Sequence, residues 1–464
     1  MTDTLRLRRQ FPAWLLAVAV GALGLWLEHR HQFSSGFDLF PGPRGDTRLT
    51  AYLCEHWYRV LKGKVAWLSP AMFFPAKGTL GYTDALLLFA PPYALLRTGG
   101  LDILTSLAVT VVVFNFLNFI VSFALLFHVF RLRWLSSVAG ALFFAFNNPK
   151  LAQPDHLQLQ SVWLLPVVVG CIILFFRDGP VLSSRRAFSL LTLAGLSLDV
   201  QLLTAFYHGW FLIVWLLILL ALAIALPQTR EFLIATMRRH RQAVLAAGAV
   251  TIVGLVPFCI IYLPAVREVG GWPYTEALRY TPQLRLYFLM ADGNFVWSGA
   301  TQRILQIAGE DPDWGQHIGI GLIPTTAWLG LSIFAATRRR QLPFLALTIM
   351  SVYLLVLLTI QYHGHSLWHV VYKFVPGATS IRAVSRFMIV AALPMSIAFA
   401  FSIQRVQEWA GKRIGLHVVL VVLIVFGAFE QFNSGAEDYY SIRAENRHLQ
   451  RSRQNCRGTA RHFT

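Results

Sequence analysis

Long apolar runs alternate with short polar segments along almost the whole chain. Most of the runs approach the roughly 20 residues that an α-helix needs to cross the hydrocarbon core of a bilayer. Backbone N–H and C=O groups have no partners in lipid, so a run that crosses the core has to form a helix. The pattern therefore predicts an all-α, polytopic membrane protein with about 11 transmembrane helices.

The polar segments divide these spans into two sides. The expected spans are residues 12–27, 103–130, 135–146, 158–176, 187–206, 209–226, 243–262, 317–335, 342–360, 387–403 and 414–429. The large outer loops are then about 28–102, 263–316 and 361–386. Apolar residues recur at helical spacing between Leu49 and Val60, which predicts an amphipathic interfacial helix in the first outer loop. Residues 83–96 are apolar but short, and they predict a second interfacial or re-entrant helix.

The composition supports a membrane protein and excludes a nucleic-acid-binding one. Hydrophobic residues make up 56% of the chain and charged residues 13%, while the net charge is +18. The basic residues cluster beside the spans, which is the pattern of the positive-inside rule. They are not interleaved with stacking aromatic residues as in a nucleic-acid groove, so we expect no nucleic-acid partner. The rule predicts a cytoplasmic N-terminus in an integral, multi-pass protein of the bacterial inner (plasma) membrane.

We expect one transmembrane domain, residues 1–430. Residues 431–464 form an external basic tail without apolar periodicity, which predicts a disordered or truncated segment. Most Asp, Glu and His residues fall on the outer side of the expected topology, and no Gly-rich phosphate loop occurs on the cytoplasmic side. Any reaction is therefore expected at the outer face.

The first candidate site is Asp46, which follows a turn rich in Pro and Gly at the start of the interfacial helix. It has two interpretations: an N-cap that accepts a backbone hydrogen bond, or a catalytic carboxylate. Glu55 and His56 lie on the same expected helix, and Asp84 lies later in the same outer loop. All three are candidates for binding a substrate.

A second group is Asp155-His156-Leu157-Gln158, at the outer end of a span. His156 and Gln158 are candidates for binding a substrate phosphate, although they would also solvate a helix start. Asp155 and His156 are candidate ligands of a divalent metal. His363 and His365 have a spacing found in metal sites, but a lone pair needs further ligands, and a solvated loop explains the pair better.

Two further features stand out for their position. Asp199 falls within an expected span, where a carboxylate either faces a cavity or ties two helices together. Arg382 and Arg386 are four residues apart at the outer start of another span, which predicts that both lie on one face of a helix. Two guanidinium groups at headgroup depth form a clamp for phosphate, or they reach toward lipid headgroups in general.

With these residues placed, the chain resembles the GT-C superfamily of integral-membrane glycosyltransferases. The resemblance extends from Leu5 to about Glu430, and its most specific segments are Pro43–Arg48, Phe74–Gly78, Asp155–Gln158 and Pro376–Phe387. Many members of that superfamily carry a folded outer domain after the last span, whereas this chain has a short polar tail.

The resemblance implies a function and a set of roles. It implies transfer of a sugar from a polyprenyl-phosphate donor to a glycan, lipid or protein acceptor, with Asp46 as general base and Arg382 and Arg386 holding the donor phosphate. A divalent metal is a possible cofactor, and membrane lipids are expected partners. The alternative is a transporter or flippase for a lipid-linked saccharide, in which Asp199 is the coupling residue. Such proteins usually contain structural repeats, and the sequence shows none.

Overall fold

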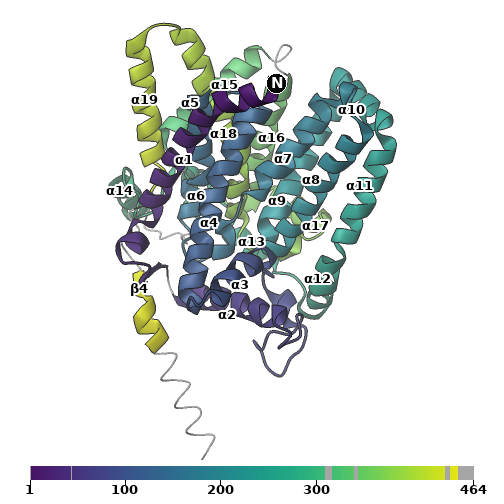
Figure 1. The fold of residues 1–464 in the computed structure, drawn as a ribbon, viewed down its shortest axis with the longest axis vertical. Coiled ribbons are helices and arrows are strands. Elements are labelled where there is room, and N and C mark those ends of the chain that lie inside the picture. Colours follow the sequence, from purple (N-terminus) through teal and green to yellow (C-terminus); the bar gives the residue numbers. More distant parts are fainter. Residues whose placement is uncertain (1, 43, 309–315, 339–342, 434–438, 448–464) are drawn as a thin grey trace, which may run out of the picture.

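The computed structural model describes residues 2–42, 44–308, 316–338, 343–433 and 439–447. It is a bundle of helices, with α2 (Arg44–Leu61) and α3 (Ala90–Thr98) lying across one end (Figure 1). The helices of the bundle are α1 (Thr2–Ser34), α4 (Ile103–Ala124), α5 (Trp134–Ala145), α7 (Leu164–Arg177), α8 (Ser184–Thr204), α9 (Phe206–Ala225), α11 (Arg241–Gly254), α12 (Val256–Val269), α15 (Leu322–Thr337), α16 (Pro343–Thr359), α18 (Phe387–Ala410) and α19 (Ile414–Phe429).

The structure confirms the all-α, polytopic fold, but it does not confirm the number of eleven spans. Within the described residues, six helices are long and apolar enough to cross a membrane, and α11 with α12 forms a seventh if the bent pair is one span. The chain bends by 47° between these two helices. Helices α15, α16 and α19 are apolar but shorter, and α5 has only 12 residues. Eleven spans remain a prediction.

Helix α18 forms the centre of the bundle. In its most apolar window, 83% of the residues are buried by neighbouring helices. Small residues let these helices approach closely: a Cβ atom added at Gly140 of α5 would lie 2.9 Å from Cβ of Ala400 and 3.0 Å from the carbonyl oxygen of Ser396. Such packing of small residues is typical of membrane helices, which gain little from burying apolar surface against lipid.

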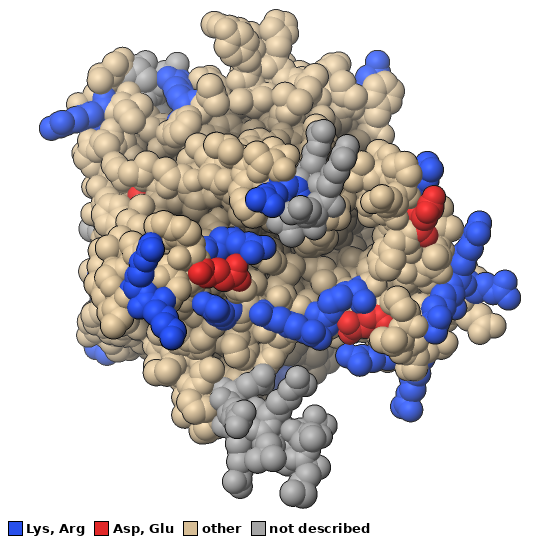
Figure 2. Space-filling model, turned by 90° about the horizontal axis from the view of Figure 1, so that it is seen from above, with Lys and Arg blue, Asp and Glu red and all other residues tan. Residues whose placement is uncertain are grey.

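The two ends of the bundle differ in character. The end that carries the N-terminus and α10 (Pro227–Arg239) bears many more Lys and Arg than Asp and Glu (Figure 2). At the other end lie α2 (Arg44–Leu61) and α3 (Ala90–Thr98), which are packed on each other (Figure 1). The nine residues of α3 are too few to span a bilayer. The positive-inside rule assigns the basic end to the cytoplasm, and this orientation remains a prediction.

The beginning of the tail is structured, which differs from our expectation for residues 431–464. Strand β4 (Tyr439–Ser441) pairs antiparallel with β1 (Leu39–Pro41), directly before α2. Residues 442–447 are helical. No local pattern predicts this pairing, because each strand has only three residues and the register depends on a partner far away in the chain.

Candidate functional site

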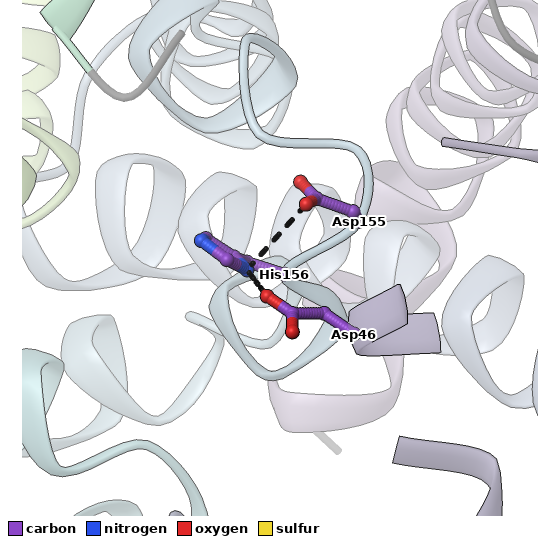
Figure 3. A group of neighbouring side chains, drawn as sticks. All are labelled: Asp46, Asp155 and His156. Carbon is purple, nitrogen blue, oxygen red and sulfur yellow. Dashed lines mark ion pairs between the residues drawn. The ribbon is translucent and has the colours of Figure 1, made fainter. Parts of the chain in front are cut away.

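Three side chains predicted from two separate segments meet at the end of the bundle that carries α2 (Figure 3). Nδ1 of His156 lies 2.8 Å from Oδ2 of Asp46 and 3.9 Å from Oδ2 of Asp155. The ligand atoms of the three residues all lie within 4.8 Å of one another. We call these residues the acid–histidine group.

The local backbone explains how the group forms. Asp46 lies in the first turn of α2 and is therefore not the N-cap of this helix. Gly42, four residues before Asp46, has φ +86°, and a Cβ atom there would lie 3.0 Å from the backbone nitrogen of Asp155. A side chain at this position would therefore separate the two segments. His156 immediately precedes the short 3-10 helix η4 (Leu157–Gln160) and is its N-cap residue.

Arg386 lies beside the acid–histidine group and is held by two side chains that the sequence did not single out. Its Nε donates a 2.9 Å hydrogen bond to Oε1 of Gln153, and its guanidinium lies 5.1 Å from the ring centre of Tyr207. The hydroxyl of Tyr207 also accepts a 2.9 Å hydrogen bond from the backbone nitrogen of Arg382. Tyr207 therefore fixes both arginines.

Arg382 has an aromatic surrounding. Its guanidinium lies 4.8 Å from the ring centre of Trp272 and 5.2 Å from that of Tyr280, which places it in contact with two π faces. The prediction that Arg382 and Arg386 share one helix face is wrong, because Val384–Arg386 forms the 3-10 turn η9 and α18 begins only at Phe387. Both arginines are close enough to Asp46 for their positive charges to act on its carboxylate.

The charges around Asp46 favour its ionised form. A hydrogen bond from His156 holds the pKa of Asp46 below its usual range, and the positive charges of Arg386 and Arg382 act in the same direction. Partial burial opposes this effect without reversing it. The Asp46 side chain remains about half exposed, at 50% of its full accessible surface. A charged and accessible carboxylate therefore lies beside two arginines.

Asp84 joins the site from a different direction. Its Oδ1 accepts a 2.8 Å hydrogen bond from the backbone nitrogen of Phe206, the first residue of α9. Desolvation raises its pKa, while the Phe206 N–H, the charge of Arg386 and a hydrogen bond with Gln158 partly oppose the rise. Asp84 and Gln158 therefore lie in the same electrostatic environment as Arg386 and His156.

Glu55 and His56 lie on α2 but are engaged elsewhere. Oε2 of Glu55 accepts hydrogen bonds from Nε of Arg97 and from the hydroxyl of Tyr93, both at 2.9 Å. Nε2 of His56 lies 2.9 Å from the carbonyl oxygen of Trp67. These contacts tie α2 to α3 and to the following loop, so the structure does not bring the two residues into the acid–histidine group.

Asp199 also lies apart from this group. It is buried on α8, and a Cβ atom at Gly254 of α11 would lie 2.2 Å from its Oδ2. Neither carboxylate oxygen has a hydrogen-bond partner within the part of the chain that the structure describes. Gly254 is the last residue of α11, directly before the bend to α12.

The residues that sequence reasoning missed are Gln153, Tyr207, Trp272 and Tyr280. Tyr207 directly follows the helix start that Asp84 caps, and Gln153 precedes Asp155 by two positions. For Gln153, its place two positions before a suspected acid was the available signal, whereas the contacts of Tyr207 depend on the fold and had no local signal. Trp272 and Tyr280 had no such signal, because they lie in a loop whose course depends on the whole bundle.

The acid–histidine group suits a divalent cation in its donor types, since two carboxylates and one imidazole bind zinc or manganese in many proteins. The predicted ligands Asp155 and His156 would then be joined by Asp46. By contrast, His363 and His365 lie in an exposed hairpin, with β2 (Gln361–Tyr362) paired to β3 (His365–Ser366). Among the described residues, neither histidine belongs to a group of three possible ligands.

Comparisons with known proteins give distant matches. No family model matches the sequence, and no curated protein matches it. Among solved structures, the crystal structure of ArnT from Cupriavidus metallidurans bound to undecaprenyl phosphate is similar over 89% of this chain and 63% of that chain. The sequence identity is 14% and the TM-score 0.43, and the chain spans less than two thirds of that protein's length. A likeness this distant carries no argument about function.

Proposed function

We propose that this protein is a membrane glycosyltransferase that moves a sugar from a polyprenyl-phosphate donor to an acceptor hydroxyl at the outer face of the membrane. The observation that carries the proposal is the position of Arg386 and Arg382 beside an ionised, accessible Asp46. The reaction needs both parts. A base accepts the proton of the attacking hydroxyl, and cationic groups stabilise the charge that develops on the departing phosphate.

In the proposed reaction, the acceptor hydroxyl gives its proton to Asp46 while its oxygen forms a bond to the anomeric carbon. The bond between that carbon and the phosphate oxygen breaks, and its electron pair stays on the lipid phosphate. Glycosyl transfer passes through an oxocarbenium-like transition state, in which the leaving bond is largely broken. A carboxylate with a lowered pKa is therefore a sufficient base, and it is fully ionised near neutral pH.

The two arginines have different parts in this scheme. The planar guanidinium of Arg386 is oriented by Gln153 and by the ring of Tyr207, so it can donate two parallel hydrogen bonds to a phosphate. The contacts of Arg382 with two aromatic rings keep its charge close without consuming its donors. A divalent cation held by Asp155 and His156 would add further positive charge toward the phosphate and leave Asp46 free as the base.

The test is consumption of a polyprenyl-phosphate hexose by the full chain in nanodiscs, followed by mass spectrometry of the released polyprenyl phosphate. A panel of donors with different sugars is needed, together with membrane extracts as the source of acceptor. We expect wild-type protein to consume at least one donor and Asp46→Asn to bind the same donor without consuming it. If no donor is bound or consumed, the proposal is wrong.

One specific observation favours the transporter hypothesis. The buried carboxylate of Asp199 has no hydrogen-bond partner among the described residues, and it lies beside the bend between α11 and α12. A protonatable group at a broken helix is a common arrangement in coupled transporters. Movement of a fluorescent lipid-linked sugar across proteoliposomes, with loss of movement in Asp199→Asn, would favour transport over transfer.

A further inference from the structure

Trp272 is a large aromatic residue at the protein surface, in contact with Arg382. It lies in the link between α12 and α13 (Tyr274–Arg279), and 44% of its accessible surface is exposed. Exposed tryptophan residues are common where a membrane protein meets the lipid headgroups, so exposure alone assigns no role to this one. Its contacts with the rest of the protein are more informative.

The backbone of Trp272 is held by two segments that are distant in sequence. Its nitrogen donates a 2.8 Å hydrogen bond to the carbonyl oxygen of Thr379, and its carbonyl oxygen accepts a 2.7 Å hydrogen bond from the hydroxyl of Tyr372. Gly271 permits this approach, because a Cβ atom there would lie 2.5 Å from Cβ of Thr379. The protein therefore fixes the position of Trp272, and a fixed residue binds a ligand at a lower entropy cost than a mobile one.

The indole ring has one charged neighbour and keeps accessible surface. The guanidinium of Arg382 lies 4.8 Å from its ring centre. Within the described part of the chain, no other aromatic ring stacks on Trp272, and no acceptor takes the hydrogen of its Nε1. Because 44% of the residue is exposed, the ring retains accessible apolar surface together with an available N–H donor.

Arg382 connects this ring to the proposed reaction. The positive charge of Arg382 acts on the carboxylate of Asp46, and Tyr207 contacts both Arg382 and Arg386. In a polyprenyl-phosphate sugar, the sugar is bonded directly to the phosphate, and its anomeric carbon has to face the attacking hydroxyl beside Asp46. A sugar whose phosphate is held by these arginines is therefore within reach of a ring that touches Arg382.

The chemistry of an indole ring matches that of a sugar. The C–H groups of a pyranose form apolar patches on its faces, which a flat aromatic ring can cover, while the hydroxyl oxygens around its edge can accept a hydrogen bond from Nε1. We propose that Trp272 is the stacking surface for the sugar of the donor. The identity of this ligand as a polyprenyl-phosphate sugar rests on the proposed transferase function.

The experiment measures equilibrium binding to the full chain in nanodiscs. The ligands are polyprenyl-phosphate glucose, polyprenyl-phosphate mannose and polyprenyl-phosphate galactose, with sugar-free polyprenyl phosphate as the reference. Trp272→Ala removes the ring, and Trp272→Phe keeps an aromatic face without the N–H donor. Arg382 keeps its contact with Tyr280, whose ring centre lies 5.2 Å away, so the phosphate-binding charge stays in place in both variants.

Trp409→Ala is the matched control at a distance from the site. Trp409 on α18 is 68% exposed, and the guanidinium of Arg413 lies 5.9 Å from its ring centre. This residue therefore has the same side chain, a similar cationic neighbour and an exposed ring. Its replacement should change the affinity for none of the four lipids.

We expect wild type to bind at least one sugar-bearing lipid more tightly than polyprenyl phosphate. Trp272→Ala should weaken binding of that lipid roughly two- to tenfold, the size of an aromatic contact, and leave polyprenyl phosphate unchanged. Trp272→Phe should lose less affinity than Trp272→Ala. The inference is overturned if the sugar adds no affinity in wild type, if Trp272→Ala weakens both kinds of lipid equally or neither, or if Trp272→Phe loses as much as Trp272→Ala.

Donor consumption in the same preparations separates the two proposals. If a donor is consumed and Trp272→Ala changes neither its consumption nor its affinity, the stacking inference is wrong and the transferase proposal stands. If Trp272→Ala loses the affinity that depends on the sugar but wild type consumes no donor, Trp272 binds a lipid-linked sugar and the transferase proposal fails.

Discussion

Arg48 of α2 and Glu445 near the end of the described chain form a hydrogen-bonded ion pair, in which Nε of Arg48 donates to Oε1 of Glu445 at 2.8 Å. Nε of Arg44 lies 3.8 Å from the other carboxylate oxygen. Glu445 is almost fully buried, with 4% of its side chain exposed, whereas both arginines are about half exposed. The C-terminal segment therefore holds the turn of α2 that carries Asp46.

The first prediction concerns this pair. Glu445→Gln should increase hydrogen exchange in β1 and in the first turn of α2, because the charge that holds Arg44 and Arg48 is removed. The expected change in the free energy of local opening is about 1 kcal/mol or less, since the arginines are partly solvated. Mass spectrometry of peptides covering residues 39–48 measures it.

Glu408→Gln is the matched control, because Glu408 pairs with Arg405 on α18 at 2.9 Å and both side chains are exposed. Exchange of residues 39–48 should be unchanged in this control. If Glu445→Gln also leaves the exchange of these residues unchanged, the C-terminal segment does not hold the turn.

The second prediction is that Asp46→Asn lowers single-turnover sugar transfer by roughly 10²- to 10⁴-fold, the size of a general-base effect. The amide cannot accept a proton from the attacking hydroxyl. Because the Asp46 side chain is half exposed, the loss of its pair with His156 should change thermal stability little. The measurement is quenched-flow transfer with thermal stability recorded in parallel.

Glu55→Gln is a useful comparison on the same helix. Glu55 is tied to Arg97 and Tyr93, so this variant should lower stability while donor consumption persists. A wild-type rate in Asp46→Asn would move the search for the base to Asp155 or Asp84.

Much of the fold could be predicted from hydropathy, because a helix in lipid must be apolar and of a fixed length. The bounds of α19 agree with the expected 414–429, and those of α5 differ by one residue at each end. The bend at Gly254 could not be predicted, since a lone glycine in an apolar run is also compatible with a straight helix.

The sequence allowed the types of residue in the site to be predicted, but not how these residues are arranged in space. Asp46 stood out because it follows a turn rich in Pro and Gly, and Asp155 and His156 stood out because they belong to a polar segment at the outer end of an expected span. Their contact depends on the close approach at Gly42, which no local pattern encodes. The η9 turn at Val384–Arg386 was missed because the i, i+4 spacing of two arginines also fits a helix. The roles of these residues remain proposals.

The third prediction compares the two arginines. Arg386→Ala should weaken binding of the donor phosphate by about 1.5 to 3 kcal/mol, the value of a hydrogen bond to a charged group. Arg382→Ala should have a smaller effect, because its charge lies among aromatic rings and influences Asp46 less than that of Arg386. Native mass spectrometry or equilibrium binding of polyprenyl phosphate gives both affinities.

The control is Arg303→Ala on α14 (Ser298–Ala308), an exposed outer arginine outside the site. If all three variants bind polyprenyl phosphate alike, the site arginines interact only with lipid headgroups in general. Arg386→Lys refines the test, because it keeps the charge and loses the planar pair of donors.

The fourth prediction concerns Tyr207→Phe, which removes the hydroxyl that accepts hydrogen bonds from the backbone nitrogens of Arg382 and Ala383. The aromatic ring under Arg386 is retained. We therefore expect weaker donor binding and a smaller effect on the step in which Asp46 acts. Donor affinity and the single-turnover rate at saturating donor separate these effects, and a change in the rate alone would contradict the positioning role.

The fifth prediction uses the raised pKa of Asp84. In the folded state desolvation disfavours the ionised carboxylate, so the pKa of Asp84 lies above the ordinary value of an aspartate. The folded protein then binds this proton more tightly than the unfolded chain, and stability from this group rises as the pH falls through the folded pKa.

Asp84→Asn removes the charge and keeps an oxygen for the Phe206 N–H. We expect a higher melting temperature for the variant at pH 7, with the difference shrinking as the pH falls through the raised pKa of Asp84 in the wild type. Thermal unfolding of both proteins in nanodiscs across this pH range measures the difference. A variant that is less stable at pH 7 would mean that Arg386 and Gln158 stabilise the ionised form more than burial disfavours it.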